Sequence, residues 1–154
     1  MASIPFEVTV GQPTMDAQHR AIWKQLVEVH RNVGAEDREG TRLALRALWD
    51  EVVAHFATEE AFMEDAAYPE RNAHRTAHLL FLEDLKELGR ELDHDGLSQE
   101  VVSWALQRIP EWIAFHVETN DVPLARYLAR RAAARMLKNA TGEGGESKPT
   151  RRDA

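Results

Sequence analysis

Hydrophobic residues recur every three or four positions in four long stretches of the chain, a spacing that predicts amphipathic helices. The first stretch begins at Met15 and ends near Gly34, because glycine suits a helix C-terminus. The second runs over residues 38–66 and has to stop before Pro69, since proline disfavours helix in the residue ahead of it. The third covers residues 71–92 and is followed by a polar Asp-His-Asp-Gly turn.

The fourth stretch contains two prolines. Ser98 is a suitable N-cap for its helix. Pro110 lies inside the helix, removes one backbone donor and is expected to kink or loosen it. Pro123 stands where a short last helix can begin, and we expect that helix to reach about Asn139. Four helices with short connections and no strand alternation predict an all-α, up-down-up-down antiparallel four-helix bundle.

Composition sets the expected boundaries and the class of protein. We expect an irregular N-terminal arm over residues 1–14, the bundle over residues 15–128, and a basic helix end with a disordered tail over residues 129–154.

The net charge is −7 and is unevenly distributed. Residues 126–154 hold eight basic and three acidic residues, a balance of +5, which leaves −12 on residues 1–125. An acidic body disfavours nucleic acid as a partner. The chain has no cysteine, no secretion signal and no apolar run that could cross a membrane, so we expect a soluble, cytoplasmic protein.

Seven histidines carry most of the chemical information. His74 and His78 are four residues apart in the third helix, so both rings project from one face. His55 and Glu59 have the same spacing in the second helix, and His19 lies among apolar residues of the first. One such residue alone is more often a hydrogen-bonded or exposed histidine than a ligand. A set distributed over every main helix instead predicts a shared polar site in the core.

His116 and Asp121 of the fourth helix are five residues apart, a step that turns two side chains away from each other on a straight α-helix. For them to converge, the helix has to open or end between them. Asn120 and Pro123 are residue types expected at such a break.

Five imidazoles and two carboxylates fit a pair of metal ions. Two octahedral ions have roughly twelve coordination positions. The five imidazoles, two carboxylates that each bind both ions, and one bridging oxygen atom fill all of these positions except one. A small molecule would bind at the open position. Nitrogen-rich, sulfur-free ligation suits iron among the redox metals, while manganese, zinc and copper are compatible by ligand type.

Several segments together resemble the hemerythrins: Asp16-Ala-Gln-His19, His55-Phe-Ala-Thr-Glu59-Glu60, Tyr68-Pro69, His74-x-x-x-His78 and Trp112-x-x-x-His116-x-x-x-x-Asp121. The resemblance covers about residues 6–128, and the cysteine-free form with the Gln-His pair is similar to the bacterial branch of that family. It implies a non-haem di-iron centre with an oxo or hydroxo bridge, also bridged by Glu59 and Asp121. One iron would take His74, His78 and His116. The other would take His19 and His55 and keep the open position for O2.

Apolar residues next to the ligands are expected to line the O2 pocket: Ile22, Trp23, Phe56, Trp112 and Ile113. Dry surroundings disfavour charged, water-assisted loss of superoxide, so we expect reversible O2 binding. The second ring nitrogen of each histidine should be tied to an oxygen atom, and the candidate partners are Gln18, Glu60 and Glu118.

The resemblance implies O2 carriage, storage, delivery or sensing, and not an enzyme. The alternative is a di-iron enzyme acting on peroxide or nitric oxide, which would need ionisable groups near the open position to move protons. A third interpretation is a metal-free interaction module. No segment identifies a protein that would receive the O2.

Other motifs are interpreted as structural. His30 and His94 are expected to be solvated, and the pair Glu91-x-x-His94 is only half of a ferritin-like site. The basic segment 126–138 is compatible with an acidic partner, a membrane surface or nucleic acid. We expect instead a solvated basic face, with Leu128 and Met136 packed on the bundle.

Overall fold

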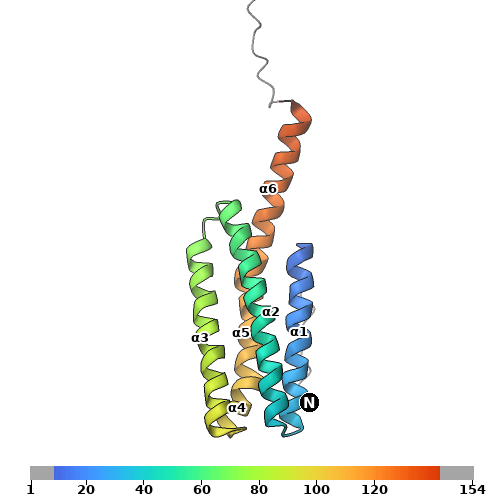
Figure 1. Cartoon of the computed structure of the whole chain (residues 1–154). Helices are drawn as coiled ribbons and strands as arrows, with labels where there is room; N and C mark the ends of the chain where they lie inside the picture. Colours follow the sequence, from blue (N-terminus) through green and yellow to red (C-terminus); the bar gives the residue numbers. More distant parts are fainter. Residues whose placement is uncertain (1–8, 143–154) are drawn as a thin grey trace, which may run out of the picture.

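The computed structural model describes residues 9–142 and forms a bundle of four long helical segments that run alternately up and down (Figure 1). The first three are α1 (Pro13–Gly34), α2 (Arg38–Asp65) and α3 (Arg71–Asp95). The fourth segment consists of α4 (Gln99–Ser103), the π-helical turn η1 (Trp104–Arg108), α5 (Ile109–His116), the π-helical turn η2 (Val117–Asp121) and α6 (Val122–Thr141). Residues 9–142 contain no strand, so the predicted all-α bundle is confirmed. The expected tail from residue 143, and residues 1–8 of the expected arm, lie outside the described residues.

Local capping makes α1 begin two residues before the predicted start. The Gln12 side chain accepts a hydrogen bond from the Met15 N–H at 2.7 Å, and Pro13 occupies the first turn, where its missing N–H is not needed. Asp16 is buried, and its carboxylate accepts hydrogen bonds from the N–H groups of residues 10 and 11 at 2.8 and 3.2 Å. These bonds fasten the described end of the arm to α1.

The other helix ends depart slightly from the predicted boundaries. α3 continues to Asp95 and includes most of the polar turn predicted there, and Gly96 follows it with a φ of 67°. Gly34 is the last residue of α1, but the positive φ beyond that helix falls on Glu36, at 55°. Ser98 caps α4 as predicted, with its hydroxyl oxygen accepting a hydrogen bond from a backbone N–H at 3.2 Å.

The fourth segment is helical without a break from residue 99 to residue 141. Pro123 therefore lies in the first turn of a helix that continues directly from η2, rather than restarting one after a gap. Immediately before Pro110, the Ile109 N–H donates to the carbonyl of Trp104, five residues back. The loosening predicted around this proline thus takes the form of the wide turn η1.

Two apolar clusters fill the bundle, one on each side of a polar layer. The main cluster extends along α1, α2, α3 and the fourth segment up to Val117. The smaller cluster joins Met15, Met63, Tyr68 and Leu124 at the other end. Glu59 and Asp121 lie between residues of the two clusters along their helical segments, and His55 and His116 directly precede Phe56 and Val117 at the end of the main cluster. Apolar packing on both sides therefore holds the polar layer in place.

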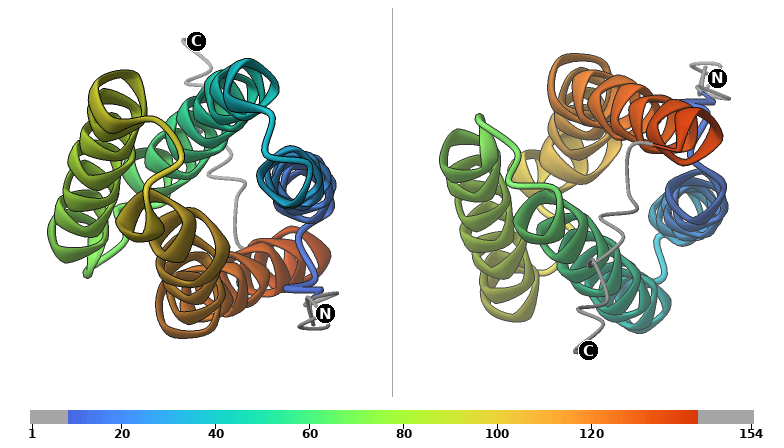
Figure 2. Two further views of the ribbon diagram at one scale, coloured as in Figure 1. Left: turned by 90° about the horizontal axis from the view of Figure 1, so that it is seen from below. Right: turned by 90° about the horizontal axis from the view of Figure 1, so that it is seen from above.

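The C-terminal half of α6 extends beyond the other helices (Figure 1; Figure 2, viewed along the bundle). Tyr127 and Leu128 pack on the smaller cluster, and the Tyr127 hydroxyl donates to the carbonyl of Ala66 at 3.2 Å. Residues 129–142 are all exposed, and Met136 is 73% exposed. The prediction that Met136 packs on the bundle is therefore wrong, because the other helices end before this level.

Within residues 9–142, no helix has both the length and the apolar character needed to span a membrane.

Candidate metal centre

The structure brings all seven predicted ligand residues to one level of the bundle. α1 contributes His19, α2 contributes His55 and Glu59, α3 contributes His74 and His78, α5 contributes His116 and η2 contributes Asp121. Their ligand-type atoms form two groups, each within 4.8 Å, that share Glu59. The side chain of His19 is 12% exposed, whereas the other six residues are buried.

The carboxylate of Asp121 faces two different pairs of histidines. Its Oδ2 lies 3.0 Å from Nε2 of His19 and 3.5 Å from Nε2 of His55. Its Oδ1 lies 3.2 Å from Nε2 of His74 and 3.1 Å from Nε2 of His116. One oxygen is therefore turned toward each half of the site, an orientation suited to a carboxylate that bridges two cations.

Glu59 also lies between the two halves. Its Oε2 is 3.0 Å from Nε2 of His78, 3.4 Å from Nε2 of His74 and 3.5 Å from Nε2 of His55. Its Oε1 is buried and has no hydrogen-bond partner among the described residues. An unpartnered buried carboxylate oxygen is costly, and a bound cation would satisfy it.

The π turn η2 explains how His116 and Asp121 converge. The Val122 N–H donates to the carbonyl of Val117, so the hydrogen bond spans five residues instead of the four of an α-helix. The added residue per turn brings a five-residue step onto one side of the helix. The prediction that the helix opens between these two residues is confirmed.

The distances between imidazole nitrogens fit a metal ion. Nε2 of His19 lies 3.1 Å from Nε2 of His55, and Nε2 of His74 lies 3.2 Å from Nε2 of His116. Metal–nitrogen bonds of roughly 2.1 Å place neighbouring ligand atoms about 3 Å apart. Donor type, spacing and the unpartnered Glu59 oxygen therefore all fit a site for cations.

Without metal, the pKa values of the two buried carboxyl groups are shifted in opposite directions. Burial favours the neutral acid at Asp121, but hydrogen bonds from His116 and three further histidines outweigh it and hold the Asp121 pKa well below its usual range. Burial and the nearby Asp121 charge raise the pKa of Glu59 well above its usual range. Asp121 is therefore the stronger acid of the two, and Glu59 binds a proton more readily.

The histidines are likewise held in different states. Burial disfavours protonation of His74, but its hydrogen bonds to Asp121 and Glu59 prevail and raise its pKa to about 9. Burial and the positive charge of the neighbouring His74 lower the pKa of His78 to about 2. Burial also lowers the pKa of His55. A binding cation consequently has to displace a proton from His74.

Outer polar groups orient three of the imidazole rings. For His19 and His74 the prediction of a partner for the second nitrogen is wrong, because their buried Nδ1 atoms have no hydrogen-bond partner among the described residues. Gln18 Oε1 lies 3.1 Å from Nδ1 of His55, and the Gln18 amide nitrogen donates to the hydroxyl of Thr58 at 2.8 Å. Glu60 Oε1 lies 3.1 Å from Nδ1 of His78. These two contacts match the predicted partners.

The predicted partner Glu118 is wrong, because its side chain is exposed at the surface. The side-chain amide of Asn120 takes that place, 3.2 Å from Nδ1 of His116. The four-residue spacing between His116 and Asn120 was the signal that could have identified this contact.

Aromatic rings cover two of the histidines. Phe56 stacks on His78 with ring centroids 3.7 Å apart, and Trp112 stacks on His116 at 4.5 Å. Phe81, which the sequence did not single out, stacks behind Trp112 at 4.0 Å. The other predicted pocket residues belong to the main cluster: Ile22 and Ile113 are buried in it, and Trp23 packs against it. The predicted wall is thus apolar, with Phe56 and Trp112 directly against ligand-type rings.

The two remaining histidines lie outside both groups. His30 donates a hydrogen bond from Nδ1 to the carbonyl of Leu26 at 3.0 Å. His94 is 85% exposed and lies beside Asp95. Their positions agree with the expectation that neither is a ligand.

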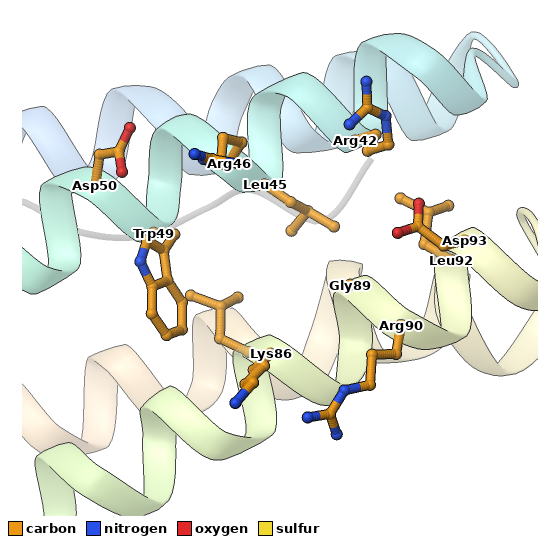
Figure 3. A pocket seen from close by; sticks show the side chains of 11 residues that line it. Arg42, Leu45, Arg46, Trp49, Asp50, Lys86, Gly89, Arg90, Leu92 and Asp93 are labelled. Carbon is orange, nitrogen blue, oxygen red and sulfur yellow. The ribbon is translucent and has the colours of Figure 1, made fainter.

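A groove of about 500 Å³ lies between α2 and α3, and none of the seven residues lines it (Figure 3). Leu45 and Trp49 extend into it, and basic side chains stand along it: Arg42, Arg46, Lys86 and Arg90. Arg42 and Arg90 form ion pairs with Glu39 and Glu87 on the same helices. Neighbouring acids therefore balance much of the positive charge at this groove.

A four-helix bundle with buried histidines and carboxylates from every long helical segment belongs to the class of bundle proteins that hold cations in their core. Residues 10–128 match the sequence profile of the Hemerythrin HHE cation binding domain. The chain therefore belongs to the hemerythrin family, whose members bind non-haem iron.

Curated relatives give a more particular assignment. The chain is 26% identical to a Bacteriohemerythrin of Pseudomonas aeruginosa over 141 residues, 90% of this chain and 88% of the relative. It is 33% identical to a Bacteriohemerythrin of Ralstonia nicotianae over 125 residues, 79% of this chain and 85% of the relative. A Bacteriohemerythrin of Methylococcus capsulatus is 27% identical over 106 residues, 69% and 79% of the two chains. The chain is thus of the bacteriohemerythrin type, in agreement with the expectation that it is not an enzyme.

Proposed function

We propose that this protein binds O2 reversibly at a pair of non-haem iron ions, for carriage, storage, delivery or sensing. One observation carries the proposal: the two oxygens of Asp121 face different pairs of histidines. A site for a single ion would need only one of these halves. In the proposed site, Asp121 and Glu59 bridge the two ions together with an oxo or hydroxo group. His74, His78 and His116 bind one ion, and His19 and His55 bind the other.

When bound, a reduced iron pair would supply the electrons that O2 takes up. The protein supplies two negative charges, on Asp121 and Glu59, in a layer that apolar clusters enclose on both sides. Gln18 and Glu60 hold the rings of His55 and His78 through their second nitrogens. Ligand histidines held in this way keep one tautomer and one orientation.

The surroundings of the site favour binding over catalytic turnover. The ring centroid of Phe56 lies 5.9 Å from that of His55, a proposed ligand of the ion with the open position, and Ile22 is buried three residues after His19 in α1. Neither side chain contains an acid or base that could move protons at neutral pH. Proton transfer is what an enzyme acting on peroxide or nitric oxide would need there. An apolar wall also keeps water from the bound ligand, which supports reversible release of O2.

Optical spectroscopy tests this proposal. The iron-loaded protein is reduced without oxygen, exposed to O2 and returned to low O2 while its spectrum is followed. We expect a stable spectrum of the oxygenated form that reverts when O2 is removed. Asp121→Asn should lose this response because its side chain cannot bridge two ions as an anion, whereas His94→Gln should retain it. Rapid multiple turnover of peroxide or nitric oxide with product release would contradict the proposal.

A further inference from the structure

The projecting half of α6 is a helix without tertiary contacts. Residues 129–142 are exposed throughout, and the other helices end before they could cover them (Figure 1). At 1.5 Å per residue, this part of the helix extends about 20 Å beyond the bundle. A helical piece of this length is only marginally stable by itself in water, because most helices gain their stability by packing an apolar face.

This part of α6 has such an apolar face. At 3.6 residues per turn, one half of its circumference collects Leu128, Ala129, Ala132, Ala133, Met136 and Leu137. The opposite half carries Arg130, Arg131, Arg135 and Lys138. Met136 and Leu137 are 73% and 67% exposed. Half of these apolar residues are alanines, which allow the backbone of another helix to approach closely.

The basic residues of α6 have no acidic partners within residues 9–142. The helix contains five basic residues and no acidic ones, and none of the five forms an ion pair with a described residue. Several acids lie in and beside the α2–α3 connection, which is at the same end of the bundle (Figure 1) and which α6 contacts through the Tyr127 hydroxyl and the carbonyl of Ala66. Asp65 and Glu70 are exposed there without an ion pair among the described residues, and Glu64 has only long contacts of 3.8 and 3.9 Å to arginines.

We propose that α6 pairs in antiparallel orientation with α6 of a second copy of this chain. A two-fold axis would bring the two apolar faces together and place each basic helix end beside Glu64, Asp65 and Glu70 of the other copy's bundle. Both copies would use the same surface in such an interface, so assembly would stop at a dimer. A lipid surface fits less well, because interfacial helices carry more large apolar residues than Met136 and Leu137.

The mass of the full chain in solution tests this inference, and iron binding does not enter the measurement. Sedimentation equilibrium should detect a dimer with a dissociation constant in roughly the micromolar range, as a contact this small allows. Met136→Gln with Leu137→Gln should raise that constant at least about tenfold, since both lie at the centre of the contact. Ala134→Gln introduces the same residue on the basic face and should leave it within about twofold. Asp65→Lys should weaken the dimer, and added salt should weaken it as well.

Three outcomes would overturn the inference. The wild-type chain could stay monomeric at several hundred micromolar, or the variant with both substitutions could dimerise as tightly as the wild type while circular dichroism shows intact helix. Sedimentation of monomeric protein with phosphatidylglycerol vesicles, but not with neutral vesicles, would instead assign the helix to an anionic lipid surface.

Discussion

Asp121 stays ionised in a place where burial alone would neutralise a carboxyl group. Hydrogen bonds from four histidines, one on each long helical segment, hold its pKa low, whereas burial and the Asp121 charge raise the pKa of the neighbouring Glu59. His74 carries the matching positive charge, with a pKa of about 9. The extra proton on His74 occupies the space where we propose that a cation binds. Metal binding and proton release are therefore linked.

This linkage predicts a pH dependence of metal affinity. His74 is protonated below its pKa of about 9, so ferrous iron has to displace that proton at any lower pH. The apparent affinity should therefore rise by roughly a factor of ten per pH unit for each proton displaced, and level off above pH 9. Anaerobic titration against a competing chelator between pH 6.5 and 9.5 measures the slope. An affinity that does not change over this range would contradict the assigned protonation states.

Gln18 is predicted to act on iron through His55. Gln18→Ala removes the oxygen that lies 3.1 Å from Nδ1 of His55 and the hydrogen bond to Thr58. Loss of such a partner typically lowers metal affinity about 10–100-fold. Gln107→Ala, at an exposed position of η1, should leave the affinity unchanged. Equal affinities of the two variants in the same chelator competition would show that Gln18 does not position His55.

At the scale of elements, backbone turns align the ligand-type residues. η2 brings Asp121 onto the side of His116, and the short α2–α3 connection sets the level of His74 relative to Glu59. That connection contains Ala67 at a φ of 49°, in the left-handed region that disfavours residues with a side chain. Its neighbour Ala66 has ordinary right-handed geometry. The connection therefore holds one strained position beside one relaxed position.

Glycine substitutions at these adjacent alanines should have opposite effects on stability. Ala67→Gly should raise the free energy of unfolding by about 0.5 kcal/mol, because the relief of the left-handed strain exceeds the entropy cost of glycine. Ala66→Gly should lower it by about 1 kcal/mol. Denaturant unfolding of the metal-free variants measures both changes. Destabilisation of similar size in both variants would show that Ala67 is not strained.

At the scale of the whole molecule, local sequence patterns were sufficient to predict the bundle and the convergence of the seven residues. The four-residue spacings of His55 with Glu59 and of His74 with His78 define helix faces directly, and the five-residue step to Asp121 requires an open turn. Features that depend on neighbouring elements were not predicted. The projection of Met136 depends on where the other helices end. The contact of Asn120 with His116 differs from this, because its four-residue spacing is visible in the sequence. The exposure of residues 129–142 therefore follows from the whole fold and could not be predicted from their hydrophobic pattern alone.

The iron content of the purified chain tests the central claim most directly. Protein expressed with ample iron should contain about two iron atoms per chain, since the two halves of the site share Glu59 and Asp121. His74→Ala and Glu59→Ala should each lose bound iron, whereas His30→Ala, a histidine outside both groups, should keep about two. Wild-type protein with well under two iron atoms per chain, or a Glu59→Ala variant with undiminished iron, would contradict the account.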